Sequence, residues 1–390
     1  LAGAGLVLGA DVLLRALIPA DTAVAVPTGV VTSLVGAVFL VATALRLRDT
    51  AGVDAPDRLR IPSRTAFLVT AAVLVAAVVG VALAGVLLGD SKLLLGDVAN
   101  WVQGRAGQTV SFVLDTRVPR VLAALCAGGA LALAGTLVQA VTRNPLAEPG
   151  VLGVSGGAAL GAVVLVTTVP AAGSWGVAGA AFGGAALASA IVFGLSARGG
   201  YRQNRLVLVG IGMAAGSTAL ISLLIVLTDP FNAVKALTWL SGSTYGRTMP
   251  DVLPVALVLT LGLAVAVARR TELDLVSLDE DTPRLLGLGL PRARLGFLVV
   301  GVLLAATAVA SAGTIGFVGL VAPHAARALV GRRHVRVVPV AVLLGAALVG
   351  TADLLGRTVI APAQLGAGLM TAVIGTPYFL HLLVRSRRAT

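Results

Sequence analysis

The stretch RVPRVLAALCAGGALALAGTLVQAVTRNPLAEPGVLGVSGGAALG, residues 117–161, decides the fold of this chain. It begins with two arginines around a proline and continues as a run without a charge from Val121 to Thr142, long enough to span a membrane as a helix. A polar break follows at residues 143–150. It contains Asn-Pro and Pro-Gly pairs, which are typical of turns because proline disfavours a helical conformation in the residue before it. The stretch therefore predicts two spanning helices joined by a tight loop.

Apolar segments of this kind recur along the whole chain. Hydrophobic residues make up 57% of the sequence and charged residues only 12%, whereas about a quarter of the residues in soluble domains are charged. This balance predicts an all-α polytopic membrane protein rather than a soluble core, and a β-barrel would need short alternating strands instead. Ten spans are expected, near residues 66–89, 121–141, 151–170, 174–196, 206–228, 252–268, 295–312, 314–330, 337–355 and 366–384.

The net charge of +12 is distributed as a membrane protein distributes it. Most of the 29 lysines and arginines fall in alternate loops, which places those loops and the C-terminus in the cytoplasm by the positive-inside rule. This pattern argues against a nucleic-acid partner and predicts a multi-pass protein of the plasma (cytoplasmic) membrane.

The two ends of the chain resemble each other. Asp11 and Arg15 near the start match Asp353 and Arg357 near the end, with the same spacing, and the similarity extends through the following apolar segment. We therefore expect residues 1–46 to be the last two spans of a preceding copy, residues 47–64 a cytoplasmic linker, and residues 65–390 a complete ten-span domain.

Several separated motifs carry a resemblance to a known family. The RVPR motif, the segment RNPLAEPGVLGVSGGA, the segment GTIGFVGLVAPHAARALVG (313–331) and the segment TAVIGTPYFLHLLVR (371–385) resemble the FecCD-type permeases, which import iron–siderophore complexes, haem and vitamin B12. The resemblance implies a ten-helix permease fold of the type II ATP-binding-cassette importers. It also implies two separate ATP-binding subunits, an extracytoplasmic substrate-binding protein and a second permease half, fused upstream or dimeric, as partners. The end-to-end similarity resembles the fused hydroxamate-siderophore permeases in particular.

Three arginines stand at span ends on the predicted outer side, against the positive-inside trend: Arg117, Arg120 and Arg357. Arginine suits bidentate pairing with a carboxylate. Snorkelling to lipid headgroups, or an Asp353–Arg357 pair one turn apart, would also explain them. The resemblance implies that these arginines receive glutamates from the substrate-binding protein, with Arg15 as the equivalent in the first half.

The resemblance also implies a cytoplasmic gate. It places Asn144 and Leu146 in one layer of the gate and Gln203 and Asn204 in a second, and a weakly binding pathway along the span 206–228. Gly-xxx-Gly spacings at Gly153, Gly157, Gly161, Gly179, Gly183, Gly212 and Gly216 predict close helix packing.

Residues 277–294, SLDEDTPRLLGLGLPRAR, are the candidate contact with the ATPase subunits. Ser277 and Glu280 have the spacing of a capping box, and Gly287 is placed to end a short helix, although an ordinary amphipathic loop would also fit. The resemblance implies that this segment docks on the ATPase. The residues assigned to this coupling are Asp279, Glu280, Asp281, Arg284, Leu286 and Gly287.

The sequence contains no motif for chemistry of its own. Neither of its two lysines lies in a phosphate-binding loop, so ATP hydrolysis by this chain is not expected. The spans carry few ionisable residues, which counts against an ion-coupled secondary transporter, the alternative of a different class. Nothing resembles a catalytic constellation, and a lone His324 does not make a metal or haem site, so we predict no metal and no cofactor. The predicted function is a permease subunit for ferric siderophores, with cobalamin or haem as the alternative cargo.

Overall fold

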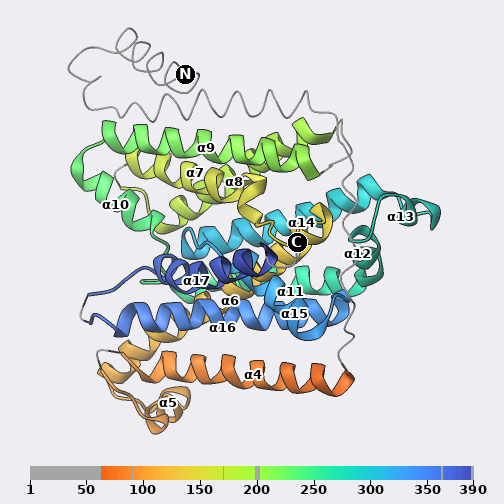
Figure 1. Cartoon of the computed structure of the whole chain (residues 1–390). Helices are drawn as coiled ribbons and strands as arrows, with labels where there is room; N and C mark the ends of the chain where they lie inside the picture. Colours follow the sequence, from red (N-terminus) through yellow and green to blue (C-terminus); the bar gives the residue numbers. More distant parts are fainter. Residues whose placement is uncertain (1–62, 90, 170, 198–202, 362, 388–390) are drawn as a thin grey trace. The chain divides into compact units, whose positions relative to one another are not determined.

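The computed structural model describes residues 63–387 except 90, 170, 198–202 and 362, as drawn in Figure 1. The predicted upstream copy (1–46) and nearly all of the predicted linker (47–64) therefore lie outside the described residues. The described residues are helices joined by irregular connections, and they form two compact units, residues 150–240 and residues 63–149 together with 241–387.

The larger unit contains ten helices among its described residues. They are α4 (Arg64–Leu87), α5 (Leu95–Val102), α6 (Gln108–Thr142), α11 (Met249–Ala268), α12 (Arg270–Val276), α13 (Asp281–Leu285), α14 (Leu290–Ala312), α15 (Val318–Val330), α16 (His334–Thr358) and α17 (Ala367–Arg387). A 3₁₀ turn, η1 (Pro149–Leu152), leads into the smaller unit. That unit contains α7 (Val154–Thr168), α8 (Ser174–Ala197), α9 (Gln203–Leu227) and α10 (Pro230–Leu240).

Each of the ten predicted spans coincides with a helix, which confirms the all-α fold. Among the described residues, seven helices are long and apolar enough to cross a membrane: α4, α6, α8, α9, α11, α14 and α16. The apolar helices α7, α15 and the described part of α17 are shorter. The short helices α5, α10 and α12 were not predicted from the sequence.

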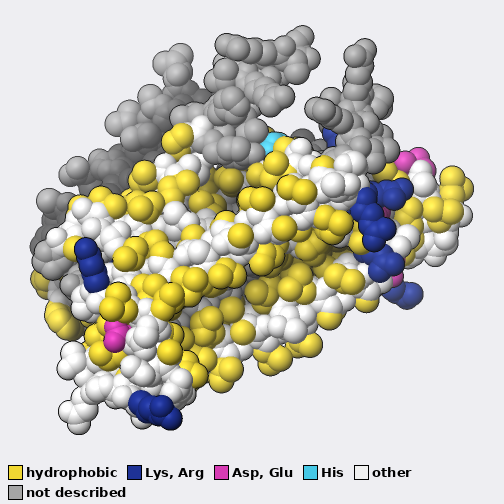
Figure 2. All heavy atoms as spheres, turned by 90° about the horizontal axis from the view of Figure 1, so that it is seen from below, with side chains coloured by type: hydrophobic (Ala, Val, Ile, Leu, Met, Phe, Trp, Pro, Cys, Tyr) yellow, Lys and Arg dark blue, Asp and Glu magenta, His cyan; other side chains and the backbone are white. Residues whose placement is uncertain are grey.

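Hydrophobic side chains cover the surface on the side of α4. Figure 2 shows this face, with lysines and arginines gathered toward its ends. Leu68, Val73 and Val79 of α4 are each about half exposed or more. Because a water-facing helix would not present such a row, this surface suits the hydrocarbon core of a bilayer.

The predicted start of the second span at residue 121 was wrong. Helix α6 begins at Gln108 and runs for 35 residues, so that the RVPR motif lies inside the helix with Pro119 in its interior. Proline at such a position removes one backbone hydrogen bond. The helix continues regardless, because Arg117, Pro119 and Arg120 are buried against neighbouring elements whose contacts outweigh the local cost.

Helix α6 is the centre of the larger unit, and glycines let its neighbours approach it closely. A methyl group on Gly128 would lie 2.2 Å from the carbonyl oxygen of Gly345 in α16, and one on Gly135 would lie 1.9 Å from that of Gly319 in α15. Such backbone-to-backbone approach lets helices pack where lipid provides no hydrophobic driving force between them.

The smaller unit uses the same device between α7 and α8. Methyl groups on Gly157 and Gly161 would lie 2.4 Å and 2.1 Å from backbone oxygens of α8, as the Gly-xxx-Gly spacing predicts. For Gly179 and Gly183 the prediction was wrong, since nothing lies within 4 Å of a methyl group at either position. The packed glycine of α8 is Gly184, one residue further along.

We expect Gly128→Ala to reduce the amount of folded protein severely, because the added methyl group forces α6 and α16 apart. Gly80→Ala in α4 is the matched control, since a methyl group there meets nothing within 4 Å and alanine favours a helix by about 1 kcal/mol. The measurement is the monodisperse fraction on size-exclusion chromatography after detergent extraction. Equal yields for the two variants would contradict the packing described for α6.

Candidate functional site

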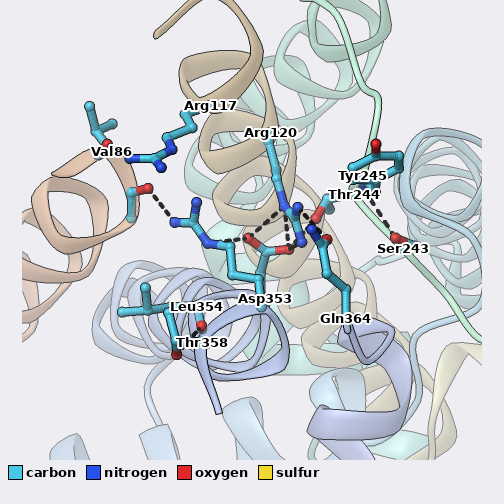
Figure 3. A network of polar contacts seen from close by, with 12 residues as sticks. Val86, Arg117, Arg120, Ser243, Thr244, Tyr245, Asp353, Leu354, Thr358 and Gln364 are labelled. Atoms are coloured by element: carbon cyan, nitrogen blue, oxygen red, sulfur yellow. Dashed lines mark hydrogen bonds and ion pairs between the residues drawn. The ribbon is translucent and has the colours of Figure 1, made fainter. Parts of the chain in front are cut away.

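Arg120 of α6 and Asp353 of α16 form a buried ion pair, drawn in Figure 3. The Nε of Arg120 lies 3.0 and 3.2 Å from the two carboxylate oxygens, and its Nη2 lies 3.0 Å from Oδ1. The hydroxyl of Thr244 donates to the same Oδ1. Because the two charged residues are 8% and 3% exposed, this pair joins α6, α16 and the segment before α11 in a region that water hardly reaches.

The other two predicted docking arginines bind the end of α4. Arg357 lies 3.8 Å from the Asp353 carboxylate and donates to the carbonyl of Gly85. Arg117 donates to the carbonyls of Val86, at 3.2 Å, and Ser91, at 2.8 Å. The last carbonyls of a helix have no partner within it and carry partial negative charge, so these guanidinium groups stabilise the C-terminal end of α4. We call Arg117, Arg120 and Arg357 the arginine cluster.

The arginine cluster borders a pocket of about 360 Å³. The Nη1 of Arg120 donates to the side-chain oxygen of Gln364 at 2.9 Å, and its guanidinium carbon lies 5.8 Å from the centre of the Tyr245 ring. The three arginines predicted from separate parts of the sequence therefore share one site. The pocket is lined by Gly89, Phe112, Thr116, Arg117, Arg120, Tyr245, Gly246, Arg357 and Gln364.

A second charged cluster surrounds Glu280. Its carboxylate pairs with Arg143, at 3.1 Å, with Arg294, at 3.3 Å, and with Arg284, at 3.6 Å. Arg143 ends α6 in a left-handed conformation (φ 50°), Arg294 belongs to α14, and Arg284 to α13. Glu280 thus ties the predicted coupling segment to the helix end that precedes the predicted gate loop.

The coupling segment forms the short helix α13, but the predicted capping box was wrong. The Ser277 hydroxyl donates to the carbonyl of Asp274. Asp279, the residue before the N-cap Glu280, binds the first turn of the helix instead. Its carboxylate accepts hydrogen bonds from the backbone of Asp281 and from the backbone and hydroxyl of Thr282. The bonds from Thr282 hold the pKa of Asp279 below its ordinary value. Asp279 lies two positions after Ser277, and aspartate caps helices as well as serine does. The helix therefore begins later than predicted, at Asp281.

The end of α13 agrees with the prediction. Gly287 has a φ of 79°, in the left-handed region that ends helices. Leu285 and Leu286 are 86% and 66% exposed. Two large apolar side chains on a short charged helix form a surface suited to a protein partner.

The predicted gate residues belong to the two compact units, Asn144 and Leu146 to the larger one and Gln203 and Asn204 to the smaller one. Asn144 accepts a hydrogen bond from the backbone of Leu146 at 2.9 Å, which makes a compact turn, and Leu146 is 40% exposed. Gln139 of α6 holds this loop in place, because its side-chain amide donates to the carbonyls of Ala147 and Gly319. Gln203 and Asn204 begin α9 in the smaller unit, and residues 198–202 before them lie outside the described residues.

The arginine cluster meets α6 about a third of the way along, at Arg117 and Arg120, whereas the Glu280 cluster meets its C-terminal cap, Arg143. Arg120 and Arg143 are 23 residues apart in this helix, which corresponds to about 35 Å at 1.5 Å per residue. This is the thickness of a bilayer core plus part of its interface. The arginine cluster and the Glu280 cluster are therefore separated along α6 by about the thickness of a bilayer core.

Thr244, Tyr245, Gln364 and Arg143 were not assigned to a site from the sequence, and Arg294 was included only as the last residue of the candidate stretch 277–294. No spacing rule could find them, because each meets its partner only through the fold. Among the described residues, no group of three or more His, Cys, Asp or Glu side chains is placed to hold a metal ion.

These features define a class: an all-helical, multi-pass membrane protein with two charged clusters along its central helix. The chain belongs to the FecCD transport family, whose sequence profile matches residues 64–385.

Relatives of known description support this assignment. The chain is 36% identical over 379 residues to the iron(3+)-hydroxamate import system permease protein FhuB of Escherichia coli (strain K12), covering 93% of this chain and 54% of that protein. It is 38% identical over 279 residues to the hemin transport system permease protein HmuU of Yersinia pestis, covering 70% of this chain and 83% of that protein. The chain thus spans about half the length of the hydroxamate permease it matches.

A solved structure has the same fold. It is an ABC transporter of the metal-chelate type in an inward-facing conformation, with a TM-score of 0.71 and 27% sequence identity. The alignment covers 82% of this chain and 99% of that one.

We expect Asp353→Ala to lower the free energy of unfolding by about 3–5 kcal/mol, because it leaves a buried guanidinium without its carboxylate. The control is Asp115→Ala, which removes an exposed carboxylate bonded to the indole of Trp101 and should cost about 1 kcal/mol. Unfolding of the purified chain in mixed micelles measures both values. Similar losses for the two variants would contradict the central place given to Asp353.

Proposed function

We propose that this chain is the membrane permease part of an ATP-driven importer that carries ferric hydroxamate siderophores into the cytoplasm. The observation that carries the proposal is the match to a hydroxamate import permease across 93% of the chain. The permease makes no covalent change to its cargo. Two separate ATPase subunits supply the energy, and a second permease half completes the pathway.

In this proposal a loaded substrate-binding protein docks at the arginine cluster through acidic side chains. The cluster suits this role because three guanidinium groups border one pocket, and arginine binds carboxylates in a bidentate geometry. The cargo then passes between the permease halves toward the gate at Asn144, Leu146, Gln203 and Asn204. The C-terminus lies on the cytoplasmic side.

The ATPase subunits bind α13 on the cytoplasmic side. Their closure moves α13, and Glu280 passes this movement to Arg143 at the end of α6 and to Arg294 of α14. The exposed Leu285 and Leu286 provide the apolar contact, and Asp279, Asp281, Arg284 and Gly287 fix the shape of the helix.

Haem is the second candidate cargo. The hemin permease of Yersinia pestis matches this chain with an identity similar to that of the hydroxamate permease, although over less of the chain. The pathway itself does not decide between the two, because a weakly binding wall need not recognise its cargo.

The proposal is tested by uptake of radiolabelled ferric hydroxamate in cells with and without the parent gene. We expect gene-dependent uptake, and we expect it to be lost in the variant Arg117→Glu, Arg120→Glu, Arg357→Glu. The changes repel an acidic partner, and they also break the buried Arg120–Asp353 pair, so only a loss at an unchanged membrane level supports the docking assignment. The control is the double variant Lys92→Glu, Arg105→Glu, which reverses two exposed charges between α4 and α6. Membrane levels are compared by immunoblot. Uptake of hemin but not of ferric hydroxamate would show that haem is the cargo. An active triple variant would overturn the docking assignment.

We expect Leu286→Asp to reduce uptake by about tenfold or more, because burying a charge in the ATPase contact costs more than 1.4 kcal/mol. The exposed leucine can be changed without disturbing the fold. Leu94→Asp is the matched control, since Leu94 is 74% exposed near the opposite end of α6. ATP hydrolysis by the assembled transporter is measured alongside. Full activity of the Leu286 variant would contradict the assignment of α13 as the coupling helix.

A further inference from the structure

One terminal nitrogen of Arg120 is bonded to a neutral group, the side-chain amide of Gln364. Arg120 gives its Nε and Nη2 to Asp353, whereas its remaining terminal nitrogen, Nη1, donates to the Oε1 of Gln364 at 2.9 Å. The Gln364 side chain lines the pocket and belongs to an exposed residue, whereas Asp353 is 3% exposed. A carboxylate binds a guanidinium more strongly than an amide does, because both groups are charged. The Arg120–Gln364 bond is therefore the one that an incoming carboxylate replaces most easily.

The surroundings of this bond favour an anion. The described lining of the pocket contains three guanidinium groups and no carboxylate. Phe112 and Tyr245, which are 71% and 70% exposed, border the same pocket and offer apolar surface beside the charges. An aromatic rim around an arginine is a common composition for the centre of a protein interface. The pocket thus fits one acidic side chain carried by a protein.

Gln364 also lies in a connection whose movement would reach a spanning helix. It stands between α16 and α17, and the following backbone is bonded in place: Leu365 donates to the carbonyl of Gly356 at 2.8 Å, and Gly368 to that of Gly242 at 3.2 Å. Methyl groups on Gly366 and Gly368 would meet the backbone of Ser241 at 2.7 and 2.6 Å. The backbone at residues 365–368 is therefore held in place, and the Gln364 side chain before it is the contact that can be exchanged.

We propose that Gln364 is a neutral placeholder on Arg120. A carboxylate from the docking protein displaces the Gln364 amide from Nη1, while Asp353 keeps its bonds to Nε and Nη2 and holds the guanidinium in place. The proposal rests on the proposed function, because it takes the docking partner to be acidic. It assigns a role to a residue on the connection between α16 and α17.

The first test compares two changes at one position by uptake of radiolabelled ferric hydroxamate. Gln364→Glu supplies a permanent carboxylate to Arg120 and should reduce uptake by about tenfold or more, as expected for the loss of one charge-assisted contact. Gln364→Ala removes the placeholder without supplying a charge, so its uptake should stay at least about fivefold above that of Gln364→Glu. Gln103→Glu makes the same change at an exposed glutamine outside the pocket lining and should have no effect. An active Gln364→Glu variant, or equal losses in the two Gln364 variants, would overturn the proposal.

The second test needs neither partner nor cargo. The purified chain with Gln364→Cys reacts with an anionic and a cationic methanethiosulfonate reagent, and the ratio of the two rates is compared with that of Gln103→Cys. The wild-type chain, with its single Cys126, gives the background. We expect the ratio to favour the anionic reagent at position 364 by about tenfold relative to position 103, because a nearby positive potential concentrates anions. Adding Arg120→Gln should remove most of this preference.

Equal ratios at the two positions would overturn the placeholder, whatever the uptake assay shows. Absence of ferric hydroxamate uptake by the wild type would count against the proposed cargo alone, because the thiol reaction still reports on the pocket. The two failures are thus distinguishable.

Discussion

The structure of the larger unit depends on how closely other backbones can approach α6. Lipid is as apolar as leucine, so burial of side chains does not by itself draw helices together in a membrane. Glycines at positions 128 and 135 of α6 face glycines 345 and 319 of its neighbours, and each contact is backbone against backbone. With α16 and α15 held at this distance, the polar groups at the two ends of α6 meet partners from distant parts of the chain.

The polar clusters fix the register of the packed helices. Glycine contacts fix the distance between helices but tolerate sliding, whereas an ion pair fixes the register. Asp353 binds Arg120 from one side while Arg357, one turn further along α16, reaches the end of α4. Charged groups so deeply buried are costly unless paired. The pairing therefore selects one arrangement of α4, α6 and α16 among those that the glycines would allow.

The sequence predicted the helices well because apolar runs of span length are a strong local signal. It placed the start of α6 thirteen residues too late, since Pro119 and two arginines suggested an end that only tertiary contacts override. The sequence also suggested Ser277 as the cap of α13, whereas Asp279 makes the bonds to the first turn. Both side chains can cap a helix, and their positions in the sequence do not show which one does. Arg120 and Asp353 are 233 residues apart, so their pairing lies beyond any local pattern.

The continuity of α6 has a consequence for energy transfer. One uninterrupted helix carries Arg120 about a third of the way along and ends at the capping residue Arg143, so a single element joins the two charged clusters. Free-energy coupling between two sites is reciprocal. Suppose that closure of the ATPases changes the affinity of the arginine pocket for the substrate-binding protein by some factor. Binding of that protein then changes the affinity of the permease for the closed ATPases by the same factor. Under the proposed function, α6 is then the element through which binding of one partner changes the affinity for the other.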